Sequence, residues 1–369
     1  MTTFDPRVSR LRGALDPEEP GARGIERVAR NPDCLRLRAL TIAGIKPATA
    51  ATILGGVDRE GQSPFALTLG QRFERQLLQN GAANLLALYR NVGHLNPTEA
   101  KVVAIDELAP GTSAAGRSRR QSETRRVIEA KLRGDPLAPN VVIKPRLTVS
   151  LVGVPHPIEP DFLVAADNDR FYRVGELKSY PDRGGKTDQS DIRSACRQAA
   201  VGVLGLREML ALLGVRNIEQ VATADADLVL RVTGLFVPTL QRQAIRGEVD
   251  SILRAIADAP TNLDELEALL PPGATLDDPA ILTAVPNHYR PSCKEHCGLW
   301  EQCRGQALAV RHPVVLGDMA AEKLAAAGSI DRALDLMAGT GAPPRNPAEA
   351  ALAEELQAAQ VMLRRAVGP

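Results

Sequence analysis

The feature that most constrains this chain is a pair of segments on either side of the turn-rich tetrapeptide DNDR. IEPDFLVAA begins at residue 158 and precedes the tetrapeptide, and RFYRVGELK follows it over residues 170–178. Two segments rich in apolar and β-branched residues around such a turn predict a β-hairpin. If Ala166 pairs with Phe171, or Asp167 with Arg170, the register places Asp161 directly across from Glu176.

Two carboxylates in this position need a cation. Opposed side chains on antiparallel strands lie about 5 Å apart, and like charges at that separation destabilise the pair. Lys178 projects from the same face as Glu176, because side chains alternate along a strand. Carboxylate oxygens suit a divalent ion, and such an ion would polarise a phosphate and activate a bound water. The alternative is an exposed hairpin whose alternating charges have no function.

Two further polar residues lie on predicted helices. Apolar residues at four-residue spacing predict an amphipathic helix over residues 68–90, and Glu74 borders its apolar face. Gln198 lies on a second predicted helix, residues 190–213, among small residues, so its amide needs a partner. Ordinary alternatives are a Glu paired with a nearby Arg and a Gln satisfied by the backbone.

The order of predicted elements indicates the fold class. A helix is followed by a strand at 146–151, the hairpin, the helix at 190–213 and a strand in DLVLRVTGLFVP, which begins at residue 227. This order predicts an α/β protein with a mixed central sheet flanked by helices. Residues 110–135 contain a group of five arginines that binds phosphates or is simply solvated: Arg117, Arg119, Arg120, Arg125 and Arg126.

Three of the five cysteines form a dense group, Cys293, Cys297 and Cys303. Four soft ligands suit Zn²⁺ or an iron-sulfur cluster, and the spacing does not choose between them. Cys34 and Cys196 are the candidates for a fourth thiol. A zinc site made of the three cysteines and His296 is the alternative.

Charge and hydropathy exclude some classes of protein. The 45 Lys and Arg residues against 44 Asp and Glu residues give a formal net charge of +1, so no global field attracts polyanions. The N-terminus lacks the apolar core of a signal peptide, and no stretch is as long and apolar as a membrane span. We therefore expect a cytoplasmic protein without membrane contact, whose thiols bind metal or are buried.

The combination of Glu74, the Asp161 of IEPD, the Glu176 and Lys178 of GELK, and Gln198 resembles the RecB-like branch of the PD-(D/E)xK nucleases. The resemblance implies a restriction-endonuclease-like core. It also implies that Mg²⁺ or Mn²⁺ is held by Glu74, Asp161, Glu176 and the carbonyl of Leu177. Lys178 would assist the attacking water, and the helix of Gln198 would contact DNA. Two positions depart from the family pattern, since many relatives have His at the position of Phe73 and Tyr at that of Gly202.

Cys34 also resembles a family feature. Iron-sulfur members of the RecB-like branch, including AddB-type and CRISPR-associated nucleases, join one N-terminal cysteine to a C-terminal triplet. The resemblance implies a 4Fe-4S cluster held by Cys34, Cys293, Cys297 and Cys303, with Zn²⁺ as the alternative. The usual triplet, C-x2-C-x5-C, is one residue tighter than the one in this chain.

These observations predict four regions: a flexible N-terminal arm (1–30), a nuclease core (31–270), a cysteine-cluster region (271–312) and an α-helical C-terminal tail (313–369). The expected function is metal-dependent hydrolysis of single-stranded DNA or duplex ends, in DNA repair or in anti-phage or CRISPR-type defence. No Walker motif is present, so a helicase or another defence protein would be a separate partner. One alternative is an inactive nucleic-acid-binding subunit of a larger nuclease or helicase complex. Another is a zinc-stapled interaction protein.

Overall fold

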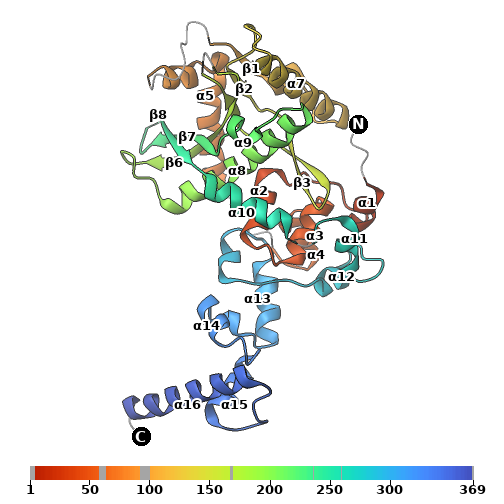
Figure 1. Cartoon of the computed structure of the whole chain (residues 1–369), viewed down its shortest axis with the longest axis vertical. Coiled ribbons are helices and arrows are strands. Elements are labelled where there is room, and N and C mark those ends of the chain that lie inside the picture. Colours follow the sequence, from red (N-terminus) through yellow and green to blue (C-terminus); the bar gives the residue numbers. More distant parts are fainter. Residues whose placement is uncertain are drawn as a thin grey trace.

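A mixed six-stranded sheet forms the centre of the protein (Figure 1). The computed structural model describes residues 5–57, 64–91, 100–166, 169–235, 237–258 and 260–367. The strand order is β1-β2-β5-β6-β7-β8, with β1 parallel to β2, β6 parallel to β7, and the other neighbours antiparallel. The strands of this sheet are β1 (Val102–Ala104), β2 (Val141–Ile143), β5 (Phe162–Val164), β6 (Arg173–Asp182), β7 (Asp225–Val232) and β8 (Pro238–Ala244).

A separate two-stranded sheet pairs β3 (Leu147–Leu151) with β4 (Val154–Ile158). The helices before β2 are α1 (Pro6–Arg12), α2 (Gly21–Arg30), α3 (Leu35–Ala43), α4 (Pro47–Ile53), α5 (Pro64–Asn91), α6 (Ile105–Leu108) and α7 (Ala114–Leu132). Those after β6 are α8 (Gln189–Leu212), α9 (Ile218–Val221), α10 (Arg246–Ala257), α11 (Leu263–Ala268), α12 (Pro279–Ala284), α13 (Trp300–Ala309), α14 (Asp318–Lys323), α15 (Ile330–Ala338) and α16 (Pro347–Val367). Two 3₁₀ turns, Pro291–Glu295 and Pro313–Leu316, flank α13.

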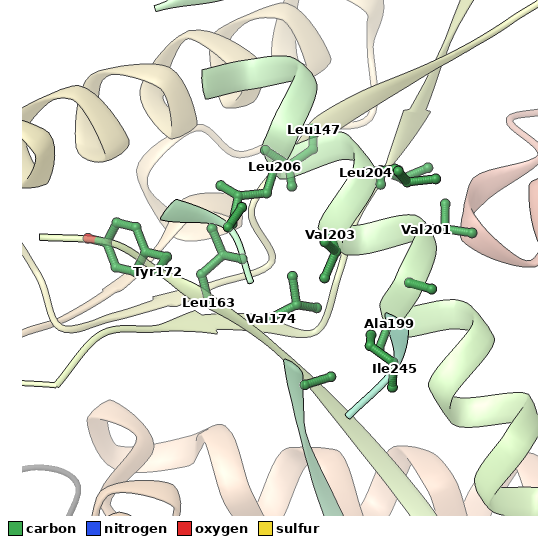
Figure 2. Close-up of a cluster of buried hydrophobic side chains, with 14 of the residues drawn as sticks. Leu147, Leu163, Tyr172, Val174, Ala199, Val201, Val203, Leu204, Leu206 and Ile245 are labelled. Carbon is green, nitrogen blue, oxygen red and sulfur yellow. The ribbon is translucent and has the colours of Figure 1, made fainter. Parts of the chain in front are cut away.

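Helices cover both faces of the main sheet, because side chains alternate along each strand. Leu163 of β5 belongs to the core beneath α8 and α10, whereas its neighbours Phe162 and Val164 belong to the core beneath α5. Figure 2 shows Leu163 and Val174 next to Val203 and other residues of α8. The predicted class, an α/β protein with a mixed sheet flanked by helices, is confirmed.

The hairpin has the predicted register. Phe162 pairs with Gly175 and Val164 with Arg173, which is the alignment that places Asp161 across from Glu176. The turn residues 167–168 lie outside the described part of the chain. Gly175 has no side chain for a steric reason, since a Cβ there would overlap the ring of the fully buried Phe162.

The N-terminal region differs from the expectation. Residues 5–30, where the sequence suggested a flexible arm, contain α1 and α2, and residues 1–4 are not described. Val8 and Leu11 of α1, and Ile25 and Val28 of α2, are almost completely buried. Three-residue spacing gives each of these short helices one apolar face, which is enough to pack it against the body of the protein.

Four strands were not expected from the sequence. β1 and β2 are three residues long, too short for a period-two pattern, and β4 contains Pro155 and Pro157. β8 is a polar edge strand. The predicted helix at 68–90 is also interrupted. Residues 79–82 are not helical, and the last three of them, Asn80, Gly81 and Ala82, have positive φ.

A second core joins the two ends of the sequence. Residues of α1 and α3 pack with residues of α11, α12 and α13 in one buried apolar cluster. Arg36 of α3, 1% exposed, donates hydrogen bonds to the carbonyls of Thr283 and Val285 at 2.8 and 2.9 Å. The N-terminal helices are therefore part of the structure around the cysteine triplet.

The helical C-terminal tail extends away from the rest of the protein (Figure 1). α15 and α16 pack on each other around a small core of their own that includes Ala333, Leu336 and Leu352. Across the described ranges, no helix has the length and apolar character that crossing a bilayer requires.

Candidate active site

Three charged residues lie side by side where β5 begins. The pairings of Phe162 with β2 and with β6 continue by one residue to Lys144, Asp161 and Glu176. The backbone N–H of Lys144 donates to the carbonyl oxygen of Asp161 at 3.0 Å, which holds this part of the ladder together. Asp161 is thus the middle member of a row that spans three strands.

Lys178 contacts Glu176, the member of this row that lies on β6. Its Nζ lies 2.8 Å from Glu176 Oε2 and donates to Oε1 of Gln198, also at 2.8 Å. Glu176 is 4% exposed, and Gln198 comes from α8, which covers this face of the sheet. The side chain of Gln198 therefore holds the ammonium of Lys178 against the acidic pair.

Lys144 links the other end of the row to α5. Its Nζ lies 2.5 Å from Glu74 Oε1 and 3.3 Å from Asp161 Oδ1. The second oxygen of Asp161 accepts a hydrogen bond from the N–H of Leu177 at 2.8 Å. The residues predicted from the sequence, Glu74, Asp161, Glu176, Leu177, Lys178 and Gln198, therefore form one connected network.

The two opposed carboxyl groups have different proton affinities. Burial, and then the neighbouring charge of Asp161, raises the pKa of Glu176, although Lys178 opposes this. Burial would also raise the pKa of Asp161, but Lys178 and Lys144 lower it below its usual range. Such divergence is expected where two carboxylates share a buried site, and a further cation would favour ionisation of both.

The chemical nature of these residues fits a divalent ion. Three residues supply carboxylate oxygens: Glu74, Asp161 and Glu176. The hydrogen bond from the N–H of Leu177 to Asp161 brings the backbone of Leu177 next to them. In the part of the chain that the structure describes, no three His, Cys, Asp or Glu side chains are already arranged around one point as ligands. The carboxylates are instead paired with the ammonium groups of Lys144 and Lys178.

The two departures from the family pattern have packing explanations. Phe73, at the position where many RecB-like nucleases have His, is 1% exposed and lies in the core between α5 and the sheet. A Cβ on Gly202 would lie 2.9 Å from Val174 and 3.2 Å from Pro160, so α8 approaches β6 too closely for a tyrosine. Both positions serve packing in this chain.

Sequence reasoning missed Lys144. The residue follows three apolar residues, Val141–Ile143, and precedes Pro145, so no local periodicity marks its environment. The pairing of β2 with β5 is what places it beside Asp161. The run of apolar residues before a single lysine was the only available signal.

The five cysteines lie in two separate cores. Cys34, Cys293, Cys297 and Cys303 are buried in the core formed by the two ends of the chain, while Cys196 lies in the core under α8. Burial raises the pKa of the three C-terminal thiols, and the neighbouring thiols, including Cys34, act in the same direction. Together with the opposing effect of Arg36, these causes bring the pKa of Cys303 to about 11. The four sulfur atoms therefore lie close enough to interact electrostatically.

Hydrogen-bond donors point at these sulfur atoms. The Sγ of Cys293 accepts from Asn31 Nδ2 at 3.5 Å and from the backbone N of Arg290 at 3.4 Å. The Sγ of Cys303 accepts from the guanidinium of Arg36 at 3.4 Å. Donors of this kind stabilise thiolates that bind a metal cluster, so the residues fit an iron-sulfur centre.

His296 remains an alternative ligand. It is 7% exposed, and the backbone of Ser292 is the polar group that favours protonation of its ring. Burial, followed by the positive charge of Arg30, lowers the pKa of His296 to about 4, so the ring is neutral at pH 7. A neutral buried imidazole is a suitable ligand for Zn²⁺.

The arginines of α7 are only partly available to a phosphate. Arg117 pairs with Glu19 at 3.1 Å, and Arg120 pairs with Glu159 at 3.1 Å. Arg126 pairs with Glu123 in the adjacent turn at 2.8 Å. The group therefore consists largely of ion pairs on the surface of a helix.

Comparisons of this chain with models of protein families, with curated proteins and with solved structures give no match. What the chain itself brings together is three carboxylates with two lysines in one network, and four thiols in one buried core. The two groups differ in chemistry. Hard oxygen ligands favour Mg²⁺ or Mn²⁺, and soft sulfur ligands favour iron-sulfur clusters or Zn²⁺.

Proposed function

We propose that this chain is a metal-dependent deoxyribonuclease of the RecB-like PD-(D/E)xK type, built on a restriction-endonuclease-like core. The observation that carries the proposal is the pairing of Asp161 with Glu176 next to a lysine that a glutamine holds in place. Two opposed carboxylates repel each other unless a cation lies beside them, and only Glu176 of this pair is fully buried. A divalent ion in such a site can polarise a phosphoryl oxygen and activate water, which is the chemistry that hydrolysis of a phosphodiester needs.

Each residue has a role in this proposal. When bound, the divalent ion would polarise the phosphate and make a bound water a stronger nucleophile. Glu74, Asp161 and Glu176 would hold the ion. The ammonium of Lys178 would orient the attacking water and stabilise negative charge on the phosphate. Gln198 would act as a positioning residue, because its contact runs to Lys178.

We further propose that Cys34, Cys293, Cys297 and Cys303 hold a 4Fe-4S cluster with a structural role. It would join α3 to the segment after α12, which bury one common core. Zn²⁺ bound with His296 is the alternative. The resemblance to RecB-like enzymes points to DNA repair or to anti-phage or CRISPR-type defence in the cytoplasm, with a helicase or another defence protein as partner.

The decisive experiment measures cleavage of end-labelled single-stranded and duplex DNA with Mn²⁺, using protein purified without oxygen. We expect the wild type to cut, and Glu176→Gln and Lys178→Met each to lose about a hundredfold in rate or more. Glu354→Gln is the matched control, since Glu354 is exposed on α16, in the C-terminal tail that extends away from the sheet (Figure 1).

The opposite result would change the reading of the site. A wild type that binds both DNAs and cuts neither would favour a non-catalytic nucleic-acid-binding subunit of a larger complex. Cleavage that persists in Glu176→Gln would place the chemistry elsewhere in the protein.

A further inference from the structure

One ammonium group lies between two of the expected metal ligands. Nζ of Lys144 is in contact with Glu74 on one side and Asp161 on the other, at 2.5 and 3.3 Å. These two carboxylates come from α5 and from the residue before β5, and within the described residues it is Lys144 that contacts both of them. Lys144 is therefore the group that joins the helix to the acidic pair.

The backbone of Lys144 is held in an unusual conformation. Its φ of 50° lies in the left-handed region, which residues with side chains seldom adopt. The hydrogen bond from its N–H to the Asp161 carbonyl fixes this conformation next to the acidic row. With the side chain 25% exposed, the ammonium lies between the protein interior and solvent.

The contacts of Lys178 are different. Its ammonium faces Glu176 and Gln198, and it forms no ion pair with Glu74. A lysine ammonium is a compact point charge with three donors, so it neutralises two carboxylates much as a metal ion does. A divalent ion that bridged Glu74 and Asp161 would need the same oxygen atoms and would repel the ammonium.

We propose that Lys144 is an internal counter-ion that holds Glu74 and Asp161 together in the metal-free protein and is displaced when Mg²⁺ or Mn²⁺ binds. This inference rests on the proposed function, because it requires these two carboxylates to be metal ligands. Lys144 is a positioning residue in this scheme. It assembles the site before the ion arrives and competes with the ion for the same oxygens.

The first test measures Mn²⁺ affinity by calorimetry without nucleic acid. We expect Lys144→Met to bind Mn²⁺ about tenfold or more tightly than the wild type, since a nearby charge shifts the proton affinity of a carboxylate by a similar factor. Lys144→Gln repeats the test if the Met variant does not fold. Lys144→Arg keeps the charge and should bind like the wild type, as should Lys186→Met, a charge removal at an exposed lysine outside the network.

The second test uses thermal unfolding. In EDTA, Lys144→Met should unfold at a lower temperature than the wild type, because Glu74 and Asp161 then repel each other without a cation. Saturating Mn²⁺ should remove this difference, since the ion takes over the same contacts. A merely structural lysine would lower the melting temperature equally with and without Mn²⁺, and that result would overturn the inference.

Asp161→Asn separates the inference from the proposed function. If Asp161→Asn abolishes Mn²⁺ binding while Lys144→Met binds no more tightly than the wild type, the metal site stands and the counter-ion role is rejected. If neither the wild type nor Lys144→Met binds Mn²⁺ at millimolar concentration, the metal site is rejected, and both proposals fall together.

Discussion

Burial changes the charge that several single side chains carry. Glu176 gains proton affinity, and His156 loses it, because an apolar environment disfavours both the carboxylate and the imidazolium. His156 lies on β4 and is 4% exposed, and its Nε2 has no hydrogen-bond partner. The neutral ring is therefore a requirement of the fold.

His156 predicts a pH dependence of stability. Its pKa is lowered to about 4 from the ordinary value of 6.5, so between these values the unfolded chain binds a proton that the folded protein does not. The free energy of unfolding is thus highest above pH 6.5 and falls as the pH drops toward 4, by about 3 kcal/mol from this residue. Urea unfolding of the wild type and of His156→Leu at several pH values measures the difference.

The comparison cancels the other titrating groups. His296, whose pKa is also lowered to about 4, contributes in the same direction to both proteins. Parallel curves of unfolding free energy against pH for the wild type and His156→Leu would contradict the prediction.

The residues of the candidate site could be predicted only where side chains alternate regularly along a strand. Alternation along the hairpin was sufficient to bring together Asp161, Glu176 and Lys178. Lys144 escaped because its environment is created by a neighbouring strand that is distant in sequence. Long-range pairing of a three-residue strand leaves no local signal.

At the scale of elements, the cysteine site depends on the docking of α3 against the segment around α13. Arg36 connects the two, since its guanidinium contacts Cys303 and the carbonyls of Thr283 and Val285 at the end of α12. Arg36 is almost completely buried, and its donors are satisfied there by uncharged oxygen atoms and the sulfur of Cys303. Thiolates bound to a cluster would add the negative charge that this cation lacks.

The fifth cysteine provides a matched control for the cluster. We expect Cys303→Ser, purified without oxygen, to contain about tenfold less iron and acid-labile sulfide than the wild type, whereas Cys196→Ser should keep both. Cys196 is equally buried but lies in the other core. Elemental analysis and the visible absorption spectrum are the measurements.

The metal content also distinguishes the alternatives. If the wild type contains zinc but no iron, and His296→Ala loses the zinc, the Zn²⁺ site is favoured. Equal iron content in Cys303→Ser and Cys196→Ser would exclude Cys303 as a ligand.

Long elements were predicted better than short ones. The helix at 190–213 and the strand at 227–238 correspond to α8 and β7, because each has enough residues to show its period. Part of the predicted strand, Phe236, lies outside the described residues. The N-terminal helices α1 and α2 were missed because short amphipathic helices with charged residues resemble a loop in composition.

At the scale of the whole molecule, the C-terminal tail is nearly independent. α15 and α16 bury their own small core, and their connection to the body includes an ion pair of Arg311 with Asp331 at 2.9 Å. Ile330 also donates its N–H to the Arg311 carbonyl at 2.8 Å. Few buried contacts would be lost if this part were absent.

A shortened chain tests this independence. A protein that ends at Gly317 should keep its melting temperature to within about 2 °C, since a loss of less than about 1 kcal/mol shifts a domain of this size by no more than that. Calorimetry of both proteins is the measurement, with DNA cleavage as a second readout. A large drop in melting temperature would show that α14 to α16 stabilise the core.

The joining of the chain ends has a consequence for biosynthesis. Asn31 meets Cys293, which is 262 residues further along the chain. A ribosome that adds 5 to 20 residues per second would need roughly 13 to 50 seconds to deliver the second partner after the first. During that time α3 can pack on α1 and α2 but lacks its contacts with α12 and α13, so Cys34 is accessible to oxidants. Insertion of the proposed cluster would therefore follow the synthesis of Cys303.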